Sequence, residues 1–599
     1  MTEMLSLTHE RVDDIPVIIG MGQRLHLPEL LDRHLGNHGL HQGLSNGTLA
    51  TVWLAYILSE GDHRKSTVQE WAESHRQTME RLLGQPIRSV EFDDDRLGIV
   101  LHRLSKDKAW EALEAELWAS TVGVYDLAPT GVRLDSTSSY GYHTVSEDGL
   151  MQFGHSKDHR PDLPQLKLMA AAIEGMGQLV ACDVLSGQRA DEPLYQPLIA
   201  RVRQVVGRSG LLYAGDCKMA SLATRADIVA HGDYYLMPLP MIGETRTQFE
   251  CWVEAVVEGE QPAQLLWGGA GLLGAGYEFE RPLSAEVDGK PVGWTERVQV
   301  IRSLALARQQ AAGLEARLRK AEEALRALTP PPGPGKRQHR AEGSLRAAIA
   351  EVEARYRVSG LLLVTLRREE ECTIHYVGRG RGGPDRPTVT DVRVRYVVSA
   401  VQRDEDAITR TCHRLGWRVQ VTNVPRAAEV PEDSPANREG EGGDQVTSMP
   451  RLGMSLAEAV IHYRGGWSLE RDFHLLKDRP LGISPLYVRN DDQIIGLTRL
   501  LSLGLRLLTL METQVRRGLA QAKDSLVGLY EGQAKKATDT PTATRLLKAF
   551  ARAEITLTRV ELGGQSLWHV TPLTGLLQRI LDHMGLSNSL YERLAENSS

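Results

Sequence analysis

The spacing of apolar positions changes along the chain, and the changes divide it into regions of different structure. From residue 1 to about 125, apolar residues recur every three or four positions, which predicts an all-helical N-terminal region. From 126 to 240, short apolar runs bounded by Gly, Ser and Asp alternate with helical patterns, as in a mixed α/β sheet. The strands are predicted at 131–134, 149–156, 166–185 with a turn at 174–177, 211–215 and 234–237, and the helices at 191–206 and 219–231.

Residues 241–450 form a long insertion after this pattern. The part at 304–356 predicts a helical hairpin, because its apolar residues are spaced four and three apart as in a coiled-coil seam. A Pro- and Gly-rich stretch at 330–335 separates the two helices, and strand patterns lie on both sides of the hairpin. A segment rich in Pro, Gly and Glu, 431–445, is predicted to be a linker. The seam residues are Leu314, Leu318, Ala321, Leu325 and Leu328.

Helical patterns return after the insertion. Residues 451–490 contain an amphipathic helix around Glu470, and 491–599 are predicted to be a helical C-terminal region. The most apolar run, 494–511, contains two arginines, so we interpret it as a buried helix and not as a membrane span.

Composition narrows the class of protein. The chain has 599 residues, 42% of them hydrophobic, which suits several folded domains and excludes a disordered chain. The net charge of −7 gives no global sign of nucleic-acid binding, although 70 lysines and arginines are enough for a local basic groove. Five scattered cysteines without a C-x-x-C pair argue against a disulfide framework or a zinc site, and the N-terminus lacks an apolar signal core. These features predict a cytoplasmic protein.

Two aspartates directly follow predicted strands, and a glutamate lies on a later helix. Asp135 follows the strand at 131–134 and Asp216 the strand at 211–215, so both are expected in the crevice where strand ends meet helix starts. Each alone is more simply explained as a helix cap. With Glu470 they make three carboxylates, which repel one another unless a divalent cation neutralises them. Oxygen-only ligands suit Mg²⁺ or Mn²⁺.

The glutamate helix also carries a cationic side chain. Glu470 and Lys477 are two helical turns apart and share a face, which suits a metal ion beside a phosphate. A buried helix with a solvated charged face explains the same pattern about equally well. Lys218, close to Asp216, is a further candidate for a phosphate contact. The three aspartates at 93–95 are interpreted as favourable charges at a helix N-terminus.

The three carboxylates, in this order, resemble the catalytic residues of the DDE transposases of bacterial insertion sequences. The resemblance is closest to the cut-and-paste branch with the signature Tyr-x2-Arg-x3-Glu-x6-Lys, on which Tyr463, Glu470 and Lys477 fall. The stretches 134–137 and 154–162 are also similar to the family, and the resemblance covers roughly residues 90–510.

One position of the signature departs from the family. Gly466 stands where the signature has Arg, and either Arg464 or Arg471 is a candidate for supplying the missing charge. This departure is the feature that leaves a catalytically inactive descendant open as an alternative.

The resemblance implies a fold and a domain order. It implies an α/β protein with an RNase H-like mixed-sheet catalytic core, interrupted by a large β-rich insertion domain with a helical hairpin and flanked by all-helical terminal regions. The implied parts are a DNA-binding N-terminal domain (1–125), the first part of the core (126–240), the insertion domain (241–450), the glutamate helix of the core (451–490) and a C-terminal region (491–599).

The resemblance also implies a reaction. Asp135, Asp216 and Glu470 would hold two Mg²⁺ ions, for which Mn²⁺ can substitute, with Asp135 bridging both. The implied activity is cleavage of phosphodiester bonds at terminal inverted repeats, followed by joining of the ends to target DNA. Family members act as homodimers on paired ends of double-stranded DNA, without a membrane. The expected DNA contacts are Tyr463, Arg464, Arg471, Lys477 and Lys218.

Two other functions remain open from the sequence. One is an RNase H-like metal-dependent nuclease that cuts DNA without strand transfer. The other is a DNA-binding descendant that has lost catalysis, against which the complete set of three carboxylates speaks.

Overall fold

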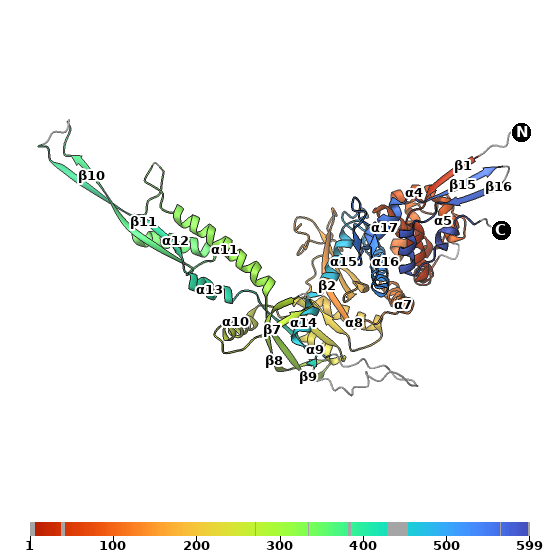
Figure 1. The fold of residues 1–599 in the computed structure, drawn as a ribbon, viewed down its shortest axis with the longest axis horizontal. Helices are drawn as coiled ribbons and strands as arrows, with labels where there is room; N and C mark the ends of the chain where they lie inside the picture. The colour runs from red at the N-terminus through yellow and green to blue at the C-terminus, as the bar shows by residue number, and fades with distance from the viewer. Residues whose placement is uncertain are drawn as a thin grey trace.

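The structure is a computed structural model with a compact body and a long arm that projects from it (Figure 1). Both chain ends lie on the side of the body away from the arm. The predicted linker at 431–445 lies outside the residues that the structure describes. Those residues are 6–37, 42–269, 271–333, 335–380, 385–427, 453–562 and 565–596.

A mixed sheet forms the centre of the body. Among the described residues its nine strands are β2 (Gly131–Tyr140), β3 (Gln165–Ile173), β4 (Leu179–Ser186), β5 (Leu212–Ala214), β6 (Tyr234–Pro238), β7 (Gln264–Gly268), β8 (Gly271–Val287), β9 (Lys290–Ser303) and β12 (Trp417–Thr422). Their order across the sheet is β4-β3-β2-β5-β6-β12-β9-β8-β7. β5 runs parallel to β2 and β6, and the other neighbours are antiparallel. This sheet confirms the predicted mixed α/β core.

Two features of the sheet differ from the prediction. The strand predicted at 149–156 is wrong: the segment is a loop with an isolated bridge between Gln152 and Gln165. Because β2 extends to Tyr140 and β4 takes the other edge of β3, no free edge of β3 is left for it. The strands β7, β8, β9 and β12 come from the segment expected to form a separate insertion domain, so the sheet continues across that boundary.

Helices pack on this sheet. They are α8 (Tyr195–Val206), α9 (Leu222–Ala230), α10 (Gly243–Val257), α14 (Leu456–Arg464), α15 (Trp467–Lys477) and α16 (Asp491–Ala522). α8 packs on β3 and β4, and α15 packs between β2 and α16. The predicted amphipathic helix around Glu470 is α15, and a turn at Gly465 and Gly466 separates it from α14, which ends at Arg464 and includes Tyr463.

The arm confirms the predicted helical hairpin. It consists of α11 (Leu304–Ala327), α12 (Glu342–Tyr356), the long strands β10 (Leu362–Tyr376) and β11 (Thr388–Arg403), and α13 (Glu405–His413). Leu314, Leu318, Ala321 and Leu325 of the predicted seam are buried against Leu345 and Ile349 of α12. The seam is therefore filled within one chain.

The terminal regions meet on the far side of the body (Figure 1). Their helices are α1 (Ile15–Arg24), α2 (Leu27–Leu35), α3 (Asn46–Glu60), α4 (Val68–Ser74), α5 (Arg76–Leu83), α6 (Asp94–Leu104), α7 (Asp107–Tyr125), α17 (Ala543–Arg552), α18 (Gly575–Met584) and α19 (Ser589–Glu592). Short 3-10 turns lie at Lys65–Thr67, Glu192–Leu194 and Cys217–Met219. As predicted, Asp93 caps α6 by accepting from the backbone N–H of Arg96.

The expectation that both terminal regions are all-helical is wrong. β1 (Ser6–Arg11) pairs with β15 (Thr556–Leu562), which pairs in turn with β16 (Gln565–Val570), and the two-residue strands β13 (Leu526–Val527) and β14 (Ala537–Thr538) pair with each other. β1 gains its hydrogen bonds from the opposite end of the chain, so its local sequence pattern carries little signal of a strand.

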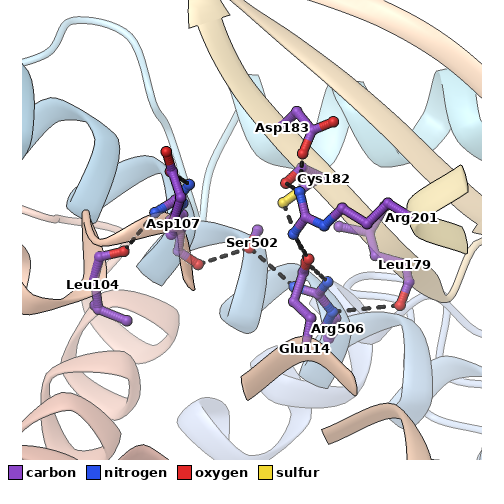
Figure 2. Close-up of polar contacts among 10 residues, drawn as sticks. Leu104, Asp107, Glu114, Leu179, Cys182, Asp183, Arg201, Ser502 and Arg506 are labelled. Carbon is purple, nitrogen blue, oxygen red and sulfur yellow. Dashed lines mark hydrogen bonds and ion pairs between the residues drawn. The ribbon is translucent and has the colours of Figure 1, made fainter. Parts of the chain in front are cut away.

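α16 is the central helix of the body. It is long and apolar enough to cross a membrane, but 94% of its most apolar window is buried inside the protein, as predicted for a core helix. Arg506 of α16 and Arg201 of α8 both form ion pairs with Glu114 of α7, whose side chain has no exposed surface (Figure 2). Arg506 also donates to Ser502 Oγ at 3.1 Å. This network joins the N-terminal helices to the sheet and to α16.

Candidate active site

The two predicted aspartates lie at the same level of adjacent parallel strands. The parallel pairing of β2 with β5 ends at Arg133 and Ala214, and Asp135 and Asp216 each lie two residues further on. Because side chains of an extended chain alternate between faces, both aspartates leave the sheet on the same side. The predicted end of the first strand at Asp135 is wrong, since β2 continues to Tyr140 along β3; only its pairing with β5 ends there.

Glu470 reaches the same place from α15. It lies in the first turn of this helix and lines a cavity of about 330 Å³ together with Asp135 and Asp216. The three carboxylates predicted from their order in the sequence therefore share one cavity. Its other lining residues are Arg133, Leu134, Gly215, Arg418, Tyr463, Arg464, Gly466, Trp467 and Leu469.

A buried tyrosine holds Asp216. The hydroxyl of Tyr195, which is fully buried, donates to Asp216 Oδ1 at 2.7 Å. The backbone N–H of Lys218 donates to the same oxygen at 2.9 Å. Burial, together with the negative charges of Asp216 and Asp135, raises the pKa of Tyr195 well above its ordinary value, so the hydroxyl keeps its proton and acts as a donor. Both bonds use Oδ1, and neither uses Oδ2.

A lysine holds Asp135. Lys157 Nζ lies 3.2 Å from Asp135 Oδ1 and also donates to the carbonyl oxygen of Ser136. Burial raises the pKa of the Asp135 carboxyl above its ordinary value; Lys157 opposes this rise, and the charge of Asp216 adds to it. The two aspartates are therefore close enough to repel each other, and a cation between them would relieve that repulsion.

The three carboxylates are chemically suited to bind a divalent cation, but their present positions do not form a complete coordination sphere. The acidic groups of the cavity offer only oxygen donors, which suit Mg²⁺ or Mn²⁺. Within the described ranges, no group of three or more His, Cys, Asp or Glu residues is arranged to hold a metal ion. Glu470 shares the cavity with the two aspartates, and its side chain would have to turn toward them to share a metal.

Three of the predicted DNA contacts, Tyr463, Arg464 and Arg471, lie in different surroundings. Tyr463 and Arg464 line the cavity, and Arg464 also donates to Ser303 Oγ at 3.1 Å. Arg471 forms an ion pair with Glu512 of α16 and is not among the residues that line the cavity. Its guanidinium group therefore helps to hold α15 on α16.

The two predicted lysine contacts lie outside the cavity. Lys477, at the end of α15, forms an ion pair with Asp158 at 2.5 Å and borders a separate cavity of about 880 Å³ between the N-terminal helices and the segment after α15. That larger cavity contains none of the three carboxylates. Lys218 is exposed next to Asp216.

The sequence did not lead us to Arg133, a buried arginine that lies beside Gly466, the position at which the signature has Arg. A Cβ atom on Gly466 would lie 2.9 Å from Arg133 Nη1, so the guanidinium of Arg133 fills the space beside Gly466. Arg133 is 6% exposed, lines the cavity, and donates to Glu174 Oε1 at 2.7 Å and to the carbonyl oxygen of His462 at 2.8 Å. The sequence does contain a signal for this residue, since Arg133 is a charged residue within an apolar strand and stands two positions before Asp135.

Comparisons with known proteins give a family match and similarity to solved structures. Residues 7–116 match a family described as a domain of unknown function, DUF4277. A solved structure titled as the piggyBac transposase synaptic complex with hairpin DNA is similar at 7% sequence identity and a TM-score of 0.31, with 97% of this chain and 84% of that chain covered. No curated protein matches the chain. Matches of this kind leave the function to be inferred from the residues of the site.

Proposed function

We propose that the chain is a DDE-type DNA transposase of an insertion sequence, working in the cytoplasm on double-stranded DNA. The observation that carries this proposal is the meeting of Asp135, Asp216 and Glu470 at one cavity, although they are far apart in the sequence. The order of these residues on two adjacent strands and a later helix also matches the transposase signature. The described N-terminal helices would then bind the ends of the element.

In this proposal the three carboxylates hold two Mg²⁺ ions, for which Mn²⁺ can substitute. When bound, such ions activate the attacking oxygen and stabilise the leaving oxygen of a phosphodiester. The chain itself supplies position: Tyr195 keeps Asp216 in one orientation, and the packing of α15 on β2 brings Glu470 to the aspartates. The same site would first free the element ends and then join them to target DNA.

The cationic and aromatic side chains around the cavity would hold the DNA backbone. Tyr463 and Arg464 line the cavity, Lys218 follows Asp216 by two residues, and Lys477 follows Glu470 by seven. Arg133, whose guanidinium lies beside Gly466, would supply the positive charge that the signature assigns to that position. Phosphate contacts of this kind fix the register of DNA without reading its sequence.

Incubation with DNA that carries the flanking repeats tests the proposal. Purified protein with Mg²⁺, repeat-bearing DNA and a target plasmid should give cuts at the repeat ends and covalent joints between those ends and the plasmid. Cuts without joints would favour the nuclease that lacks strand transfer. Repeat binding without cuts would favour the inactive descendant, and inactivity toward every DNA would contradict the proposal.

Replacing Lys477 by Ala should weaken binding to element-end DNA, and to DNA of other sequences to the same extent. One phosphate contact fewer should lower the slope of log K against log salt by about one unit. The measurement is a salt series of binding isotherms, with Lys320→Ala on the exposed side of α11 as the matched control. A slope identical to that of the unchanged protein would remove Lys477 from the DNA-binding surface.

The cleavage-competent complex should contain two copies of the chain. Two element ends must be cut and joined to one target, which a single site on one chain does poorly. Because the α11–α12 seam is filled within the chain, the partner surface is expected elsewhere. Light scattering of the complex with end DNA measures its mass, and a mass of one chain per active complex would refute the prediction.

A further inference from the structure

Lys157 forms an ion pair with one carboxylate oxygen of Asp135, the first of the three candidate metal ligands. Its Nζ is 3.2 Å from Asp135 Oδ1, and the lysine side chain is 30% exposed, so solvent and a ligand can reach it. The backbone N–H of Lys157 donates to Ser138 Oγ at 2.9 Å. The loop between β2 and β3 is therefore fixed on β2 at the residue that meets the candidate metal ligand.

The next residue of this loop makes a second ion pair, with the other side of the site. Asp158 Oδ1 is 2.5 Å from Nζ of Lys477, at the end of α15. Lys157 and Asp158 thus connect the strand that carries Asp135 with the helix that carries Glu470. The two ion pairs have similar chemistry, but only that of Lys157 uses a carboxylate of the cavity.

An ammonium group and a divalent cation compete for the same carboxylate oxygen. Both are attracted to it, and they repel each other at the distance at which both would be bound. A cation that binds Asp135 Oδ1 would therefore displace Lys157, and a cation that binds the other carboxylate oxygen would be repelled by the ammonium group nearby. The released ammonium group carries three N–H donors and remains at the edge of the cavity, where it can bind a phosphate oxygen.

We propose that Lys157 neutralises Asp135 in the free protein, gives up this carboxylate when a divalent cation binds, and then contacts a phosphate of the DNA. This inference rests on the proposed function, since it requires a metal site at Asp135. It assigns Lys157 two effects of opposite sign. The lysine weakens cation binding to the free protein, and it strengthens DNA binding only in the metal-loaded state.

Calorimetric titration of the full chain with Mn²⁺ in the absence of DNA tests the first effect. Lys157→Ala should bind Mn²⁺ about tenfold more tightly or better, because an opposite charge at this distance shifts a carboxyl pKa by about 1–3 units and a cation responds to the same field. Lys157→Arg keeps the charge and should bind Mn²⁺ as the unchanged protein does. Lys65→Ala is the matched control, because Lys65 pairs with Asp94 among the N-terminal helices, outside the cavity, and its Mn²⁺ affinity should not change.

DNA binding in the presence and absence of the metal tests the second effect. With Ca²⁺ or Mn²⁺ present, Lys157→Ala should lower the salt slope for repeat-bearing DNA by about one unit, and without divalent cations it should leave the slope unchanged. Thermal denaturation reports whether each variant is folded, and Lys157→Gln replaces the Ala variant if that variant unfolds.

The outcomes separate the inference from the proposed function. Equal or weaker Mn²⁺ affinity in Lys157→Ala, with Mn²⁺ bound by the unchanged protein, overturns the inference and leaves the transposase proposal standing. A lower salt slope in both the presence and the absence of metal also overturns it, because Lys157 would then contact DNA independently of Asp135. If the unchanged protein binds no Mn²⁺ and cuts no DNA, the proposed function fails and the inference fails with it.

Discussion

Replacing Glu470 by Gln should reduce cleavage of element-end DNA by more than about a hundredfold, because even residues that only support a metal ligand cost about 10–100-fold when they are replaced. The amide keeps the size of the side chain but removes the charge needed to hold a divalent cation. Binding of end DNA should change little, since its affinity comes mainly from lysine and arginine contacts to phosphates. Single-turnover cleavage and binding isotherms of the same preparation measure the two effects separately.

A matched control separates this effect from a general loss of charge. Glu250 on α10 is exposed and pairs with Arg246 in the preceding turn, so Glu250→Gln should cleave as the unchanged protein does. Asp135→Asn and Asp216→Asn should behave as Glu470→Gln does. Full cleavage by Glu470→Gln would remove this residue from the site, even though it lines the cavity.

Replacing Glu114 by Ala should destabilise the body by about 3–5 kcal/mol, the usual cost of removing one partner from a buried ion pair. The change leaves Arg201 and Arg506 buried beside each other without their shared carboxylate (Figure 2). Total stabilities are about 5–15 kcal/mol, so a loss of this size should lower the melting temperature strongly and reduce the yield of soluble protein. Differential scanning fluorimetry measures the effect.

The control for this prediction is an exposed ion pair. Glu342 and Arg346 lie one turn apart on α12 with both side chains largely exposed, and such pairs contribute about 0.3–0.5 kcal/mol. Glu342→Ala should therefore melt almost as the unchanged protein does. Equal melting temperatures for the Glu114 and Glu342 variants would show that the buried network does not hold the terminal helices to the sheet.

The candidate site could be predicted to the extent that its residues follow local patterns. Asp135 and Asp216 come after short apolar runs and Glu470 lies on an amphipathic helix, so their order along the chain was informative. Lys157 and Tyr195 were not assigned to the two aspartates, because those contacts depend on how a loop and a helix return to the sheet. Such contacts leave no periodic signal in a single sequence.

The same distinction explains the fold. The α11–α12 hairpin and the burial of α16 were predicted because four-three spacing and a continuous apolar run are local features. The pairing of β1 with β15 was not, since it joins opposite ends of the chain. The continuation of the core sheet by β12 and β9 could not be predicted either, because the pattern of one strand does not specify which strands pair with it.

The measurement that tests the central claim most directly is anomalous diffraction from crystals of the full chain grown with Mn²⁺ and end DNA. Manganese peaks should appear in the cavity at coordination distance, about 2.1 Å, from carboxylate oxygens of Asp135, Asp216 and Glu470. The Glu470 side chain should turn toward the two aspartates from its present position in the wall of the cavity. Manganese bound elsewhere, or a Glu470 carboxylate that stays more than about 10 Å from a metal held by the aspartates, would contradict a shared two-metal site.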